Sequence, residues 1–152
     1  MADNQCRETI NQLLKDVFYN ILDIQQASIA SLTKRKLTVH ELHVLEAIEN
    51  ADPCTMGTVA SLLGVQTSTL TVSVNRLVKK NMVRRSRDEG DRRKVFLELT
   101  DEGRHYNRCH REFHEEMVSA VVDEFCIADY PELVRGLTAL RGFFRSRYAG
   151  LL

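Results

Sequence analysis

The stretch from Thr55 to Thr100 constrains the fold of this chain more than any other part of its sequence. Its first half, TMGTVASLLGVQTSTLTVSVNRLVKK, places apolar residues three and four positions apart on both sides of a glycine. This spacing is typical of two helices joined by a tight turn. Its second half, NMVRRSRDEGDRRKVFLELT, alternates apolar and polar residues around an arginine-rich segment, which favours a β-hairpin.

The two predicted helices need a small residue at their crossing and a flexible residue at their turn. Ala60 and Gly64 meet these needs, because alanine allows close approach and glycine adopts turn conformations that other residues avoid. The expected inner face of the first helix comprises Val59, Ala60, Leu62 and Leu63. The expected inner face of the second helix comprises Leu70, Val74, Leu77 and Val78.

The outward face of the second helix follows from a rotation of about 100° per residue. It presents small polar and basic groups, which are Ser68, Thr69, Val72, Asn75, Arg76 and Lys79. Hydroxyl, amide and methyl groups can contact base edges, and an asparagine can read adenine. The arginine and the lysine suit phosphate contacts. We therefore predict that this helix reads double-stranded DNA.

The predicted hairpin carries its charge at the tip. Gly90 suits the turn, and Asp91, Arg92 and Arg93 follow it directly. An arginine at such a tip can enter the narrow, electronegative minor groove of DNA, and Asp91 can hold one of the two following arginines in place. A reading helix followed at once by a basic hairpin predicts a winged helix-turn-helix DNA-binding protein.

The formal net charge of the chain is zero, but the charge is unevenly distributed. Residues 76–94 contain nine basic and three acidic residues, a net +6, so the remainder carries −6. A basic patch on an acidic body orients a protein towards phosphates. This segregation argues against the alternative of a winged helix used for protein–protein contact, as in some scaffolds.

Long apolar-rich helices are predicted on both sides of this module, over residues 5–33 and 101–150. Helices with apolar residues on more than one side usually pack against a partner chain as well as their own core. The expected fold is mainly α with a small β-hairpin wing, in one domain of residues 1–152. The DNA-binding lobe spans about residues 38–100, and the flanking helices serve dimerisation.

Composition argues against several other classes of protein. The sequence has no apolar run long enough to span a membrane and no signal peptide, so a cytoplasmic protein is expected. The four cysteines show no CxxC spacing, which indicates reduced thiols. No glycine-rich phosphate loop, nucleophile elbow or paired-carboxylate motif occurs, so neither catalytic residues nor enzyme activity are predicted.

The order of the predicted elements resembles the MarR family of bacterial transcription factors over essentially the whole chain. The motif that carries the resemblance is Asp88-x-x-Asp91-Arg92-Arg93 followed by Val95-x-Leu97-x-Leu99-Thr100-x-x-Gly103. The resemblance implies a homodimer on a pseudo-palindromic operator, with the reading helix in the major groove. It also implies that the wing enters the minor groove through Arg93, and that Asp91 orients this arginine.

Within the family, residues 66–81 and 110–118 resemble the repressors of fatty-acid synthesis genes. In that branch an acyl-acyl carrier protein acts as corepressor, which implies an acyl-chain tunnel in the helical layer. The resemblance thus predicts a repressor of fatty-acid synthesis genes, with a possible acyl-chain ligand and no other cofactor.

A histidine cluster leaves a zinc-responsive repressor as an alternative. His110 and His114 lie four positions apart, a spacing found in metal sites. With His43, they fall where zinc-dependent repressors of the family have ligands. Gln25 and Ser31 stand where those repressors supply glutamate and cysteine ligands. Interhelical hydrogen bonding is therefore the preferred role, with zinc sensing and a pH or ligand role as alternatives, and no metal site is predicted.

A thiol-based redox sensor is a second alternative. Cys6 lies roughly where thiol-sensing members of the family keep a reactive cysteine. Apart from Arg7, no basic residue is visibly placed to activate its thiol. A structural or incidental cysteine is therefore expected.

Overall fold

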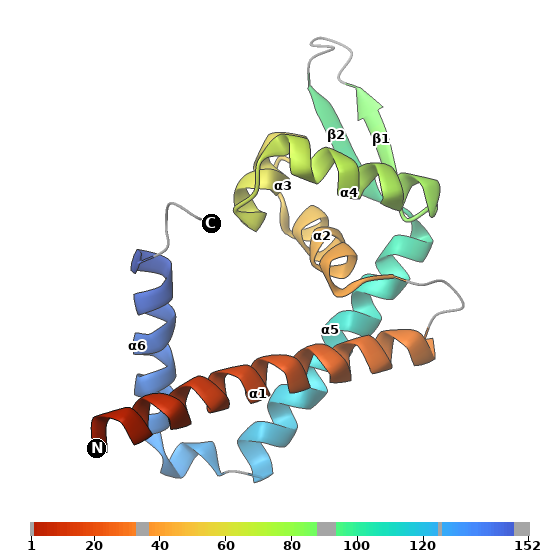
Figure 1. The fold of residues 1–152 in the computed structure, drawn as a ribbon. Coiled ribbons are helices and arrows are strands. Elements are labelled where there is room, and N and C mark those ends of the chain that lie inside the picture. The colour runs from red at the N-terminus through yellow and green to blue at the C-terminus, as the bar shows by residue number, and fades with distance from the viewer. Residues whose placement is uncertain (1, 33–36, 88–93, 125, 148–152) are drawn as a thin grey trace.

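The computed structural model describes residues 2–32, 37–87, 94–124 and 126–147 (Figure 1). The elements are α1 (Ala2–Leu32), α2 (Val39–Asn50), α3 (Met56–Leu63), α4 (Thr67–Lys79), β1 (Val83–Arg87), β2 (Val95–Leu99), α5 (Asp101–Glu124), the short 3-10 helix η1 (Ile127–Asp129) and α6 (Pro131–Arg147). The predicted fold class is confirmed, because two antiparallel strands follow a pair of short helices and long helices flank this module.

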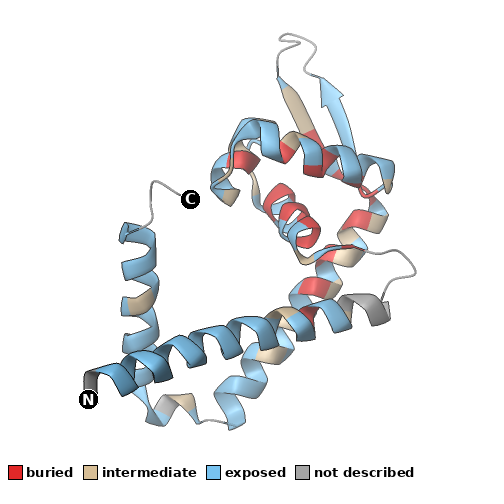
Figure 2. Cartoon of the chain, viewed as in Figure 1, coloured by how far each residue is buried: buried red, intermediate tan, exposed pale blue. Residues whose placement is uncertain are grey.

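The hydrophobic core lies in the lobe formed by α2, α3, α4 and the hairpin (Figure 2). Its largest fully buried side chains are Leu37, Val44, Leu45, Val59, Leu70, Val74, Leu77, Met82 and Val83. The second helix, α2, contacts α3, α4, β2 and α5. Burial of each aliphatic side chain contributes roughly 1.5–3 kcal/mol, so the lobe is the best-stabilised part of the single chain.

The start of α2 is fixed by a capping box. The Thr38 hydroxyl accepts a hydrogen bond from the backbone N–H of Glu41 at 3.2 Å, and the Glu41 carboxylate accepts one from the backbone N–H of Thr38 at 2.9 Å. Leu37 and Leu42, on either side of the box, are both buried. Together these contacts satisfy free backbone donors and fix where the chain enters the helix.

The turn between α3 and α4 uses the residues that the sequence predicts. Thr55 caps α3 by accepting a hydrogen bond from the backbone N–H of Thr58. Gly64 ends the helix in the left-handed region, at φ 67° and ψ 28°, where a side chain would cost energy. Ala60 is buried at the crossing of the two helices, which permits their close approach.

Two predicted core positions are wrong. Leu62 is 57% exposed, because Val59 and Ala60 fill the buried side of α3 and leave Leu62 on its outer side. Val78 is 39% exposed, and Ser73 is buried on α4 instead. The Ser73 hydroxyl lies 3.0 Å from His40 Nε2 of α2, so the face of α4 that meets α2 contains a polar contact that the apolar pattern does not indicate.

A threonine and a glycine connect the hairpin to α5. The Thr100 hydroxyl donates to the Asn81 carbonyl at 2.7 Å and accepts from the backbone N–H of Gly103 at 3.0 Å. A Cβ atom on Gly103 would lie 2.1 Å from the carbonyl oxygen of Met82. The Thr100-x-x-Gly103 part of the sequence motif therefore holds α5 against the turn that follows α4.

The flanking helices extend away from the lobe. In Figure 1, α5 runs from the base of the wing past α1, and α6 stands apart from the lobe beyond η1. The large apolar residues of α6 are not buried in the single chain, since Leu133, Leu137 and Phe144 are between 40% and 58% exposed. Across the described residues, no helix is long and apolar enough to cross a membrane.

Candidate nucleic-acid interface and histidine cluster

The predicted reading face of α4 forms one exposed surface. Its six predicted residues are all solvent-exposed: Ser68, Thr69, Val72, Asn75, Arg76 and Lys79. Opposite them, Leu70, Val74 and Leu77 are buried in the core and anchor the helix. Val72 is 52% exposed among polar neighbours, which leaves a methyl-bearing side chain available to a ligand. Hydroxyl, amide, methyl and basic groups thus share one rigid surface.

Polar contacts from α2 fix the position of α4. Near the middle of α4, His40 of α2 contacts the buried Ser73. Beyond its end, Lys80 Nζ lies 2.7 Å from both carboxylate oxygens of Glu41, whose side chain is only 5% exposed. The sequence pattern places Lys80 in the basic patch of residues 76–94 and gives no sign of this ion pair. Because Lys80 pairs with Glu41, it adds less to the positive surface than its formal charge indicates.

A hydrogen bond joins the reading helix to the described base of the wing. Arg85 Nη1 of β1 donates to Asn75 Oδ1 of α4 at 2.7 Å. Asn75 is a predicted base-reading residue, but its contact with Arg85 could not be predicted, because the two residues belong to different elements.

The tip of the wing carries the other predicted DNA-binding residues. Asp91, Arg92 and Arg93 lie outside the described residues. At the base of the wing, β1 pairs with β2 in a register that places Val83 opposite Leu99 and Arg85 opposite Leu97. Basic residues on this base are exposed, namely Arg84, Arg85, Arg87 and Lys94.

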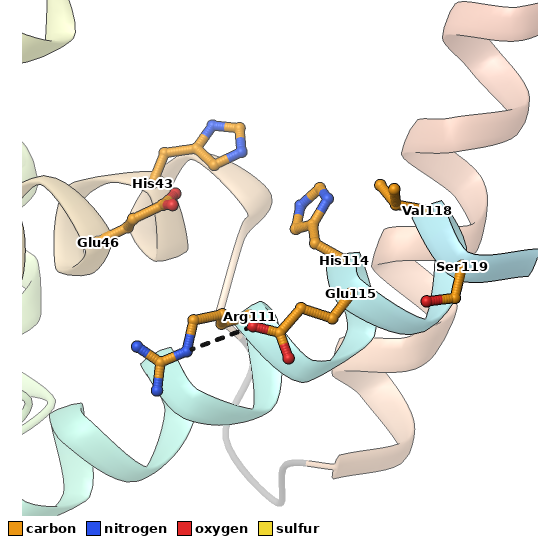
Figure 3. A pocket seen from close by; sticks show the side chains of 7 residues that line it. All are labelled: His43, Glu46, Arg111, His114, Glu115, Val118 and Ser119. Atoms are coloured by element: carbon orange, nitrogen blue, oxygen red, sulfur yellow. Dashed lines mark ion pairs between the residues drawn. The ribbon is translucent and has the colours of Figure 1, made fainter. Parts of the chain in front are cut away.

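The three predicted histidines come together between α2 and α5. One ring nitrogen from each of His43, His110 and His114 lies within 4.8 Å of the other two. Figure 3 shows His43 and His114 projecting into the same pocket, with the Arg111–Glu115 ion pair of α5 at its edge. The pair indicated by its spacing, His110 and His114, therefore lies together with His43, which the family resemblance added.

Two histidines of the cluster, His43 and His110, have lowered pKa values. Burial, and next the nearby His114 and His43, lower the pKa of His110 to about 4. Burial also lowers the pKa of His43, although the carboxylate of Glu46 opposes this effect. The buried His110 Nε2 makes no hydrogen bond within the described part of the chain. His43 and His110 are thus neutral imidazoles at pH 7, and the buried Nε2 of His110 is unpaired within the described residues.

A glutamine from α1 completes this arrangement. The side chain of Gln25 is buried, and its Nε2 atom lies 2.9 Å from Nε2 of His114. This contact agrees with the interhelical hydrogen bonding that the sequence analysis preferred. The side chain of Ser31, the other position compared with zinc ligands, lies outside the described residues.

The cysteines differ in their surroundings. Cys6 is exposed on α1, and no disulfide forms among the four cysteines. Cys54 is partly buried and donates to the carbonyl of Ile48 at 3.2 Å. Burial raises the pKa of the Cys54 thiol, which lowers the fraction of reactive thiolate.

The fold and the exposed basic reading face define a winged helix-turn-helix DNA-binding protein, and comparison with known proteins agrees. The MarR family model matches residues 37–95. The Streptococcus pneumoniae FabT structure, solved in complex with DNA, is 32% identical at a TM-score of 0.84, covering 92% of this chain and 98% of that chain. The chain belongs to the MarR family of DNA-binding transcriptional regulators.

Two Bacillus subtilis relatives extend this comparison. The HTH-type transcriptional repressor MdtR is 29% identical over 100 residues, and the uncharacterised regulator YvnA is 27% identical over 99 residues. Each alignment covers 63% of this chain, and the chain spans 64% of MdtR and 63% of YvnA. These relatives are described as transcriptional regulators, a class that acts by binding DNA and not by catalysis.

Proposed function

We propose that this chain is a transcriptional repressor that binds a pseudo-palindromic operator as a homodimer. The observation that carries the proposal is the reading face of α4, exposed on a fold similar to that of FabT in complex with DNA. Ser68, Thr69, Val72 and Asn75 would contact base edges in the major groove. Arg76 and Lys79 would bind phosphates, and Asp91, Arg92 and Arg93 would act at the minor groove.

The apolar surfaces of the flanking helices support the homodimer. In the single chain, α1 exposes Val17 and Phe18 at 56% and 58%, and no described residue of α6 is buried. Exposed apolar surface on two helices is stabilised when a second copy of the chain covers it. A two-fold axis through these helices would present two copies of α4 to half-sites about one helical turn of DNA apart. Light scattering should give the mass of two chains, and Phe18→Glu should lower it towards one.

Salt titration tests phosphate binding by α4. With a fluorescent operator duplex, Arg76→Ala should weaken binding for every sequence and lower the slope of log affinity against log salt by about 1 per protomer. Arg141→Ala is the matched control, because Arg141 is an exposed arginine on α6. Equal slopes for Arg76→Ala and the unmodified chain would remove Arg76 from the interface.

We further propose a role at fatty-acid synthesis genes, with an acyl-acyl carrier protein as corepressor. This rests on the resemblance of residues 66–81 and 110–118 to that branch of the family and on the likeness to FabT. The acyl chain would lie among α1, α2 and α5, next to the pocket that Val118, His43 and His114 line. In operator titrations the acylated carrier protein should increase affinity, and the carrier protein without its acyl chain should not. Equal operator affinity with both forms would argue against this corepressor.

A zinc-responsive repressor is the second candidate, and the unpaired Nε2 of the buried His110 favours it. Neutral imidazoles are good zinc ligands. The three ring nitrogens lie within 4.8 Å of one another, so small side-chain shifts would place each of them roughly 2.1 Å from a shared zinc ion. The contact between Gln25 and His114 competes for one of these nitrogens. Zinc binding that disappears in His114→Gln and changes operator affinity would support this candidate, whereas unchanged operator affinity would reject it.

A further inference from the structure

We infer that Asn75 and Arg85 read DNA as one unit, and that Arg85 makes Asn75 prefer guanine over adenine. The inference rests on the proposed reading of DNA by α4. It starts from the 2.7 Å hydrogen bond between Arg85 Nη1 and Asn75 Oδ1, which links the first strand of the wing to the exposed face of the helix.

The architecture of the hairpin explains why Arg85 reaches α4. Alternate residues of a strand point to the same face, so Arg85 shares a face with Val83. Its cross-strand neighbour is Leu97. Val83 and Leu97 are buried, so this face of the hairpin is its inner face. Arg85 lies on the same face, but it is beyond the buried part and is exposed. Its neighbour Arg84 lies on the opposite face of the hairpin, across from Glu98.

The chemistry of the two side chains fixes how the amide is oriented. A guanidinium group has N–H donors and no acceptor, so only the amide oxygen of Asn75 can bond to Arg85. The Nδ2 group of Asn75 is therefore directed away from Arg85, with its two donors available to DNA.

This arrangement changes the base that Asn75 should recognise. An unconstrained asparagine reads adenine by accepting from N6 and donating to N7. Here the oxygen already accepts a charge-assisted hydrogen bond, which is stronger than a neutral one. The pair then presents N–H donors from both residues, and guanine offers two adjacent acceptors, O6 and N7, in the major groove. Adenine and cytosine each place an amino donor in the major groove, opposite the N–H donors of the pair.

Selection from randomised duplexes by the full chain tests this inference. The unmodified chain should select guanine at one position of each half-site, and Arg85→Ala should shift that position towards adenine by about tenfold in relative affinity. Arg84→Ala removes the same charge from the opposite face and should lower overall affinity while guanine is retained. Arg85→Lys keeps an N–H donor and should retain guanine.

The outcomes separate base reading from general attraction to phosphates. The same base preference in the unmodified chain and Arg85→Ala would overturn the inference, as would an equal shift in Arg84→Ala. Asn75→Ala provides an independent measurement, since it should abolish the preference at the same position. If Asn75→Ala binds with unchanged preferences, the inference fails while the proposed DNA binding stands. If the unmodified chain selects no sequence, the proposed function fails as well.

Discussion

The ion pair between Glu41 and Lys80 should have unequal effects when each partner is replaced. Lys80→Met leaves the Glu41 carboxylate, 5% exposed, without its cation. A buried charge deprived of its partner costs about 3–5 kcal/mol. Glu41→Gln leaves the ammonium group of Lys80, whose side chain is 31% exposed, within reach of water. The glutamine oxygen can still accept from Thr38, so we expect this change to cost about 1–2 kcal/mol.

Urea denaturation at pH 7, followed by circular dichroism, measures these differences. Every variant should be compared at one fixed chain concentration, because the stability of a dimer depends on concentration. The double variant removes the buried carboxylate together with its cation, so it should be more stable than Lys80→Met alone. The reasoning fails if Lys80→Met costs no more than Glu41→Gln, or if the two single effects are additive.

Three further predictions concern protonation, packing and thiol reactivity. Because the folded chain keeps His110 neutral to about pH 4 and unfolded histidine titrates near 6.5, stability should fall as pH drops between these values, by up to about 3 kcal/mol. In urea denaturation with a metal chelator, His110→Gln should reduce this slope. Gly103→Ala should destabilise the fold by about 3 kcal/mol or more in the same assay, since its Cβ meets the Met82 carbonyl. Brief alkylation analysed by mass spectrometry should label the exposed Cys6 before Cys54, whose pKa is raised by burial.

Features encoded within a few neighbouring residues were predicted correctly from the sequence. Gly64 provides the predicted turn between α3 and α4, because turn chemistry depends on short segments. The outward face of α4 was also predictable, since it follows from helical periodicity once the core residues are identified.

Contacts between distant elements were not predictable in the same way. Periodicity favoured Val78 over Ser73 as a core residue, but the contact with His40 is made from another helix. The partner of Asn75 lies ten positions further on, across the boundary between a helix and a strand. A side chain as long as arginine can reach several neighbours, and the fold decides which one it meets.

The exposed apolar surface of α6 has a consequence for gene dosage. An isolated chain offers this surface to proteases and chaperones, so chains that have not yet assembled should be removed faster than assembled ones. With the dimer proposed above, the amount of DNA-binding species rises with about the square of chain concentration at low expression. Halving synthesis would then reduce occupied operators by more than half, giving control of the target genes a steep threshold.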